Sequence, residues 1–230
     1  MPSVEQRDVR ALLVHRHQWV RIRVRVQNAL QSIALTHGVR RGAGLWSHGG
    51  QRQLADLALP PYAGARRSKL MRLRTQLQQE IELLDAEVAR AAEQRPLARL
   101  LMTHPGVGPV TGLATEVFLG DAARFADGKA VASYAGMIPS ESSSGSKRRL
   151  GKLSKQGNPL LRMLWCEAAG HAVRKDDELK RFYRRKLAQK GLGIALVAAA
   201  RKLGIRLWIM LREQIDYEEF CRRGRQRGEA

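Results

Sequence analysis

The sequence is poor in residue types that mark several protein classes. Aromatic residues make up 5% of its 230 positions, and it contains 8 prolines and 2 cysteines. Cys166 and Cys221 lie far apart, so they form no metal-binding pair, and both are expected to be reduced thiols in a cytoplasmic protein. Because Ala, Leu and Arg dominate the remainder, the composition favours helix and predicts little sheet.

Long apolar runs and clustered metal ligands are also missing. No run reaches the roughly 18 residues of a membrane span, and the opening segment Met1–Arg7 is polar, unlike a signal peptide. The 6 histidines are scattered, and the 21 acids nowhere group as a complete metal-binding nuclease site. The sequence therefore predicts a cytoplasmic protein without a membrane partner and without a metal site of its own.

Positive charge is the abundant property. The chain has 41 Lys and Arg against 21 acids, a formal net charge of +20. A surplus of this size repels itself in a compact fold and favours a polyanionic partner, most often nucleic acid. Charge alone also fits an acidic membrane surface or a ribosome- or RNA-associated protein.

Two long helices are predicted in the first 95 residues. Apolar residues at heptad spacing predict a helix over residues 1–37. Residues 38–67 contain glycine and proline pairs and predict a connecting loop. Ser68 is a candidate N-cap for a second helix over residues 68–95. We expect an antiparallel helical hairpin or coiled coil, whose apolar stripes either close on each other or also join two chains.

Residues 96–217 predict a separate, mainly helical domain, followed by a basic tail over residues 218–230 that is expected to be disordered. The first motif of this domain is Pro105-Gly106-Val107-Gly108, a tight turn between two short helices. Helix-hairpin-helix DNA-binding modules use such a turn, because glycines let backbone N–H groups approach a phosphate. Gly106 and Gly108 are therefore candidate DNA-binding residues, and an ordinary turn without a ligand is the alternative.

A stretch rich in Ser, Gly, Lys and Arg spans residues 137–157 and predicts a loop, since it has no apolar period. Cations in this loop would contact phosphates and stabilise the added negative charge of a pentacovalent phosphorus. A serine among them is a candidate nucleophile if a base or a metal takes its proton. A flexible basic loop is the alternative. The candidate phosphate-binding cations are Lys147, Arg148, Arg149, Lys152 and Lys155.

Two later helices carry the other candidate DNA contacts. Asn158 followed by Pro159 predicts a helix start, and Arg162 lies in its first turn. In the segment Lys180–Lys186, Arg184 and Arg185 alternate with aromatic residues, an arrangement that can follow a phosphate backbone. A solvated helix face with core aromatics is the alternative.

Taken in order, these motifs resemble the C-terminal transposase domain of the one-hundred-and-ten insertion-sequence family. Its members are bridge-RNA-guided transposases related to the Piv-type DNA invertases. The resemblance covers roughly residues 97–217, and residues 4–40 resemble the helix that follows the family's N-terminal nuclease-like domain. The segments that carry the resemblance are Leu101–Val110, Ser133–Pro139, Ser143–Gly145, Ser154–Asn158, Glu167–Ala169 and Ala200–Leu203.

The resemblance implies DNA strand exchange through a covalent phosphoserine link, with Ser144 as the nucleophile and Ser143 as the alternate. It also implies a homo-oligomer, a DNA partner and a structured guide RNA. The family's nuclease-like domain binds divalent metal through four acids, which this sequence lacks. Mg²⁺ is thus expected in the complete enzyme, with ligands outside this chain. A catalytically incomplete DNA-binding fragment is the alternative function.

Overall fold

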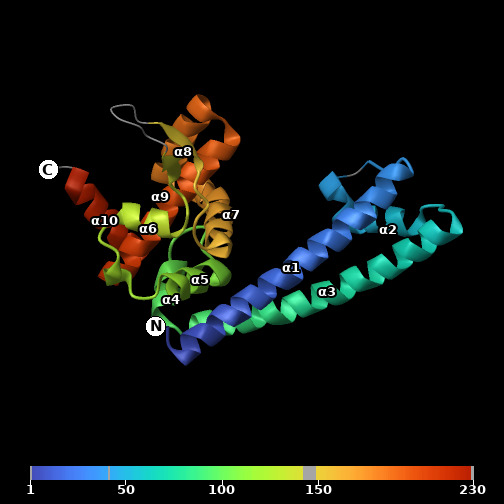
Figure 1. Ribbon diagram of the computed structural model, residues 1–230, viewed down its shortest axis with the longest axis horizontal. Helices are drawn as coiled ribbons and strands as arrows, with labels where there is room; N and C mark the ends of the chain where they lie inside the picture. Colours follow the sequence, from blue (N-terminus) through green and yellow to red (C-terminus); the bar gives the residue numbers. More distant parts are fainter. Residues whose placement is uncertain (1, 41, 142–148, 229–230) are drawn as a thin grey trace. The chain divides into compact units, whose positions relative to one another are not determined.

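The chain folds almost entirely as helices, arranged in two compact units. The computed structural model describes residues 2–40, 42–141 and 149–228. One unit comprises Met1–Leu13 together with Glu87–Ala230, and the other comprises Val14–Ala86. Figure 1 shows the helices of each unit. The prediction of a mainly α protein is confirmed, although the larger unit also contains the first residues of the chain, which the predicted boundary at 96 did not include.

The smaller unit is built on an antiparallel helix pair, formed by parts of α1 (Val4–Thr36) and α3 (Pro61–Glu93). Arg16 Nε donates to Asp85 Oδ1 at 2.6 Å, and Arg23 Nη1 donates to Gln78 Oε1 at 2.8 Å. Residue numbers that rise on one helix therefore pair with numbers that fall on the other. The predicted helical hairpin is confirmed. Its buried core includes Val26, Leu30 and Leu77.

The predicted loop over residues 38–67 is wrong. It contains a 3₁₀ helix, η1 (Gly42–Trp46), then α2 (His48–Asp56) and the start of α3. Ser47 caps α2 by accepting a hydrogen bond from Gly50 N at 3.2 Å, and Pro61 occupies the first position of α3, where proline is favourable. Ser68 lies inside α3 instead of capping it, and its Oγ donates to Gly64 O at 3.0 Å.

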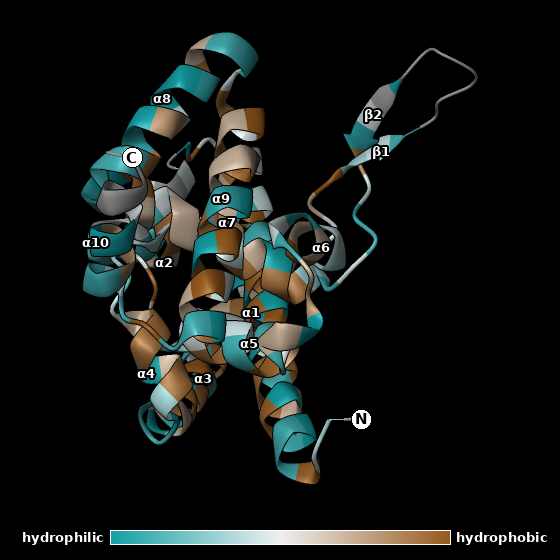
Figure 2. Cartoon of the chain, turned by 90° about the vertical axis from the view of Figure 1, so that its left-hand side faces the viewer, coloured by the Kyte–Doolittle hydropathy of each residue, from teal (hydrophilic) through white to brown (hydrophobic). Residues whose placement is uncertain are grey.

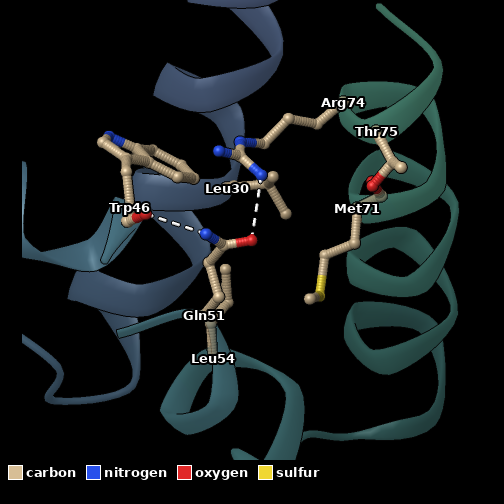
Figure 3. Close-up of a pocket in the computed structure, with 7 residues that line it drawn as sticks. All are labelled: Leu30, Trp46, Gln51, Leu54, Met71, Arg74 and Thr75. Atoms are coloured by element: carbon tan, nitrogen blue, oxygen red, sulfur yellow. Dashed lines mark hydrogen bonds between the residues drawn. The ribbon is translucent and has the colours of Figure 1, made fainter. Parts of the chain in front are cut away.

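Side-chain contacts hold the connecting segment against α3, as Figure 3 shows. Gln51 Nε2 donates to Trp46 O at 2.8 Å, and Arg74 Nη1 donates to Gln51 Oε1 at 3.0 Å. The Arg74 guanidinium also lies 5.1 Å from the centre of the Trp46 ring. These partners are distant in sequence, so helix propensity alone did not reveal them.

The larger unit is a helical body with α9 at its centre. Gly204 of α9 lies against Trp165, which is fully buried and whose Nε1 donates to Thr115 Oγ1 at 2.9 Å. The helices that pack around α9 bring the apolar core together in this unit. Besides α9 (Leu192–Glu213), they are α4 (Pro96–Met102), α5 (Pro109–Leu119), η2 (Ala122–Arg124), α6 (Gly128–Tyr134), α7 (Pro159–Lys175), α8 (Asp177–Lys190) and α10 (Tyr217–Gly228).

A two-stranded antiparallel ribbon replaces part of the loop predicted over residues 137–157. Strand β1 (Pro139–Glu141) pairs with β2 (Leu150–Leu153), with Pro139 opposite Leu153 and Glu141 opposite Leu150. Figure 2 shows the ribbon standing away from the helices of its unit. Because it is short and packs little apolar surface, its sequence has no clear period of two.

The basic tail is not disordered as predicted, since α10 continues to Gly228. Asp216 accepts a hydrogen bond from Glu219 N at 2.8 Å and so begins this helix. Glu219 then pairs with Arg222 and Arg223, one helical turn later. Such i,i+3 and i,i+4 pairs stabilise a helix that composition alone assigns to disorder.

Candidate nucleic-acid interface

The two glycines of the α4–α5 turn have different roles. Gly106 has a φ of +93°, and an added Cβ would lie 2.5 Å from the backbone nitrogen of Ala172 on α7. Glycine is therefore required at position 106 by its positive φ and by its close packing against α7. Gly108 is exposed, precedes Pro109 at the start of α5, and has open space around a hypothetical Cβ. Of the two glycines, Gly108 is therefore the exposed one with open space beside it.

A buried polar network lies beneath this turn. Asp176, the N-cap of α8, accepts hydrogen bonds from Leu179 N, Tyr217 Oη and an Arg206 guanidinium nitrogen. Although burial opposes ionisation, the Leu179 hydrogen bond and the Arg206 charge hold the pKa of Asp176 below its usual range. Arg206 also bonds Glu178. The network ties α8, α9 and α10 together and leaves Asp176 ionised.

His104 is fully buried beside this network. Its Nδ1 lies 3.0 Å from the carbonyl oxygen of Pro105, so Nδ1 carries the proton and donates. Burial lowers the pKa of His104 to about 4. The 3.8 Å approach of its Nε2 to Asp176 is therefore not an ion pair at neutral pH, because the ring is uncharged. His104 is therefore an uncharged, buried side chain at neutral pH.

The base of the ribbon is held by Arg162 of α7. Its Nη1 donates to Ala135 O at 2.9 Å and to Lys155 O at 3.4 Å, which joins the two arms of the ribbon. Gly136, with a φ of +67°, leaves room for this guanidinium, since an added Cβ would lie 2.8 Å from Nη1. Arg162 therefore positions the ribbon. Because its Nη1 already donates to these two carbonyl oxygens, that nitrogen is less available for the predicted direct contact with DNA.

The second arm of the ribbon carries exposed cations. Arg149 directly precedes β2, Lys152 lies within it, and Lys155 follows it with a φ of +57°. The candidate nucleophiles Ser143 and Ser144 and the cations Lys147 and Arg148 lie between the strands and outside the described residues. The second arm of the ribbon thus carries three of the five predicted loop cations.

A groove of about 1240 Å³ runs between the ribbon and helices α8, α9 and α10. Lys152 and Lys155 line it from the ribbon side, and Arg185 and Lys186 line it from α8. Arg184 is exposed on α8 but does not line the groove. The structure therefore brings together only some of the predicted DNA contacts, and it separates the adjacent arginines 184 and 185.

Sequence analysis missed the contribution of α9. Arg201 and Lys202 line the groove together with the ribbon cations, some fifty positions earlier in the chain. The available signal was the spacing of Ile194, Val197, Arg201 and Ile205, which places them on one helical stripe. That stripe lies beside the fully buried stripe of α9, and its members Val197 and Ile205 are only half-buried at the edge of the core.

The residues present do not form a metal site in the part of the chain that the structure describes. No group of three or more His, Cys, Asp or Glu side chains there could hold a metal ion. Glu178, the acid in the groove, is bonded by Lys202 and Arg206. The Mg²⁺ implied by the resemblance therefore does not fit these residues, and no step proposed below passes through it. Among the described helices, none is long and apolar enough to cross a membrane.

Part of this interface lies in a segment that matches a known protein family. Residues 98–184 match the Transposase IS116/IS110/IS902 family. This segment belongs to that transposase family. It contains the glycine turn, the ribbon, Arg162 and the first part of α8, whereas the groove cations Arg185, Arg201 and Lys202 come after it.

Two relatives match almost the whole chain, and a third matches part of it. A "Probable family 20 transposase" of Pseudomonas aeruginosa is 28% identical, over 94% of this chain and 66% of its own length. The "Transposase for insertion sequence element IS1111A" of Coxiella burnetii is 27% identical, over 94% of this chain and 61% of its own. An IS110 protein of Streptomyces coelicolor is 30% identical over 63% of this chain and 36% of its own. The chain thus spans about two thirds or less of these transposases.

Proposed function

We propose that this chain provides the DNA-binding and strand-exchange part of an insertion-sequence transposase. The observation that carries the proposal is the cationic ribbon, whose second arm presents Arg149, Lys152 and Lys155 shortly after the serine segment. The match of residues 98–184 to the IS116/IS110/IS902 transposases supports it, as does the net charge of +20.

The proposed chemistry is attack of Ser144 Oγ on a DNA phosphodiester, with Ser143 as the alternate. The Oγ–H bond gives up its proton, an Oγ–P bond forms, and the P–O bond to one deoxyribose breaks. The departing sugar oxygen takes a proton and becomes a hydroxyl. Attack by a hydroxyl of the second DNA strand then reverses these events and releases the serine. No hydrolysis intervenes, so the ester bond energy is kept for rejoining.

Two features of the described residues suit this chemistry. Lys152 and Lys155 would offset the negative charge that accumulates on the pentacovalent phosphorus. Glu141, which ends β1, is the acid nearest to Ser144 in the sequence, and the sequence analysis did not consider it. A carboxylate at this position is a candidate acceptor for the serine proton.

The test is the formation of a covalent protein–DNA adduct on supercoiled plasmid carrying the ends of the insertion sequence. The chain is assayed alone and together with the part of the Pseudomonas relative that it does not match. We expect an adduct with the complement present, its loss in Ser144→Ala, and little change in DNA affinity. Mass spectrometry names the linked residue, and an adduct that persists in a Ser143→Ala/Ser144→Ala double variant would rule out the serine.

The second candidate is a DNA-binding module without catalysis. It is favoured because Glu178, the acid that lines the groove, already accepts hydrogen bonds from Lys202 and Arg206. It predicts tight, salt-sensitive DNA binding with no adduct under either condition. The same assay therefore separates the two functions. Glu141→Gln adds a finer distinction, since it should slow adduct formation without weakening binding only if the carboxylate takes the serine proton.

A further inference from the structure

Helix α9 presents two apolar faces, one fully buried and the other partly exposed. Ala199, Leu203 and Leu207 are fully buried in the core of the larger unit. A second stripe, including Ile194, Val197 and Ile205, lines the groove, where Val197 and Ile205 are half-buried at the edge of the core and Ile194 is 60% exposed. A helix that packs on one side needs one apolar stripe. A second, partly exposed stripe in a groove indicates a binding surface.

The groove is large and walled on several sides by apolar side chains. Leu153 and Pro139 contribute from the ribbon, Phe182 from α8 and Phe220 from α10. Its volume of about 1240 Å³ exceeds the roughly 300–1,000 Å³ of pockets that enclose a drug-sized molecule. An extended occupant therefore fits the groove better than a single small molecule.

The charge of the lining residues selects an anionic occupant. Cationic side chains outnumber acids seven to one, and the one acid, Glu178, is already bonded by Lys202 and Arg206. Within the part of the chain that is described, Lys152, Arg185 and Arg201 form no ion pair with an acid. Cations that line an apolar groove without carboxylate partners suit a polymer with repeated negative charges.

Phe182 gives the groove an aromatic surface surrounded by cations. Lys202 Nζ lies 5.2 Å from its ring centre, Arg185 Cζ 5.8 Å and Lys186 Nζ 5.9 Å. Basic grooves with aromatic side chains are typical of sites for single-stranded nucleic acid, where bases stack and phosphates meet cations. A duplex hides its base faces, so it would satisfy the cations and leave the apolar floor uncovered.

We propose that the groove between the ribbon and α8–α9 binds an unpaired stretch of DNA, with bases against the apolar floor and phosphates at the cationic rim. The inference rests on the proposed function for the identity of the polymer as DNA. It adds that the DNA is locally unpaired where it passes the ribbon, and it assigns Phe182 and the outer stripe of α9 to that contact.

The first measurement compares the affinity of the chain for a duplex with its affinity for the same duplex carrying a central unpaired bubble. Stacking of one base on an aromatic side chain is worth a factor of about five or more in affinity. We therefore expect at least this preference for the bubbled DNA. Phe182→Leu should remove most of the preference, whereas Phe182→Trp, which retains a stacking surface, should keep it.

Two pairs of neighbouring residues provide matched controls. Ile194→Gln should weaken binding of the bubbled DNA, while Leu192→Gln should not, because Leu192 is 68% exposed but does not line the groove. Arg185→Gln should weaken binding of bubbled DNA more than Arg184→Gln does. All four side chains are on exposed or half-exposed helix positions, so each variant is expected to retain its circular dichroism spectrum.

Equal affinity for duplex and bubble, with Ile194→Gln no weaker than Leu192→Gln, would overturn the inference. If the chain still forms the serine adduct in that case, the proposed function stands and only the groove assignment fails. Failure to bind either DNA would overturn both. If Ile194→Gln changes the mass of the particle in light scattering without changing DNA affinity, the groove is a contact between copies of the chain and the inference fails.

Discussion

At the scale of single residues, His104 illustrates how burial converts a titratable side chain into a packing element. Its ring is fully buried, and its pKa is lowered from 6.5 to about 4 by that burial. Below about pH 6.5 the unfolded chain therefore takes up a proton at this position that the folded chain does not. The free energy of unfolding falls as the pH decreases from 6.5 toward 4 and levels off below that range.

We predict a loss of about 2 kcal/mol in the free energy of unfolding between about pH 7 and pH 5 from this residue. Urea unfolding of the larger unit at the two pH values measures it. His104→Asn should lose this pH dependence, because the amide can still donate to Pro105 O but does not titrate. Asp176, whose pKa is also lowered, acts only at more acidic pH, so a variant with an unchanged slope between pH 7 and pH 5 would contradict the prediction.

The glycine turn yields a second prediction at this scale. Gly106→Ala should destabilise the larger unit, since a positive φ alone costs roughly 1–3 kcal/mol and the added Cβ would also contact Ala172 N at 2.5 Å. Gly108→Val should keep its helix content and melting temperature, because the space around it is open. If Gly108 faces a phosphate, this variant weakens DNA binding. Unchanged affinity would make both glycines purely structural.

At the scale of elements, two leucines of α3 distinguish packing within one chain from association between chains. Leu77 is 2% exposed between α1 and α3, whereas Leu73, one turn earlier on α3, is 41% exposed. Burying an unpaired carboxylate costs several kcal/mol, so Leu77→Asp should unfold this unit. Circular dichroism and hydrogen exchange measure that loss.

Leu73→Asp is the matched variant and should retain the fold. If copies of the chain associate through the outer face of this hairpin, as the twin apolar stripes suggested, Leu73→Asp should lower the particle mass in light scattering. A wild-type chain that is monomeric at high concentration would remove the predicted homo-oligomer. The hairpin would remain, because its buried contacts lie within one chain.

The ribbon and α10 show why some elements escaped the sequence analysis. The period of two is not visible in strands of three and four residues whose side chains are mostly exposed. In α10, basic composition predicted disorder, but Asp216 and Glu219 supply a cap and two ion pairs. By contrast, Asn158 was correctly predicted as a helix start, since it accepts hydrogen bonds from the N–H groups of Leu160 and Leu161.

At the scale of the whole molecule, the net charge of +20 leads to a prediction about ionic strength. Binding of duplex DNA should weaken roughly a thousandfold or more between about 50 and 200 mM salt if six or more phosphates are neutralised. A Lys152→Gln/Lys155→Gln variant should lower the slope of log affinity against log salt by roughly two. Fluorescence anisotropy at several salt concentrations measures both. An affinity independent of salt would contradict phosphate-based binding.

The sequence by itself determined the helical class, the long hairpin helices, the helix start at Asn158, and the positive charge. These depend on composition, periodicity and caps, which act within a few residues. Only the tertiary structure decided that Arg201 and Lys202 share a groove with Lys152, that Arg185 lines it while Arg184 does not, and that Gly106 packs against α7. These arrangements depend on contacts between segments far apart in the chain, and local residue spacing does not predict such contacts.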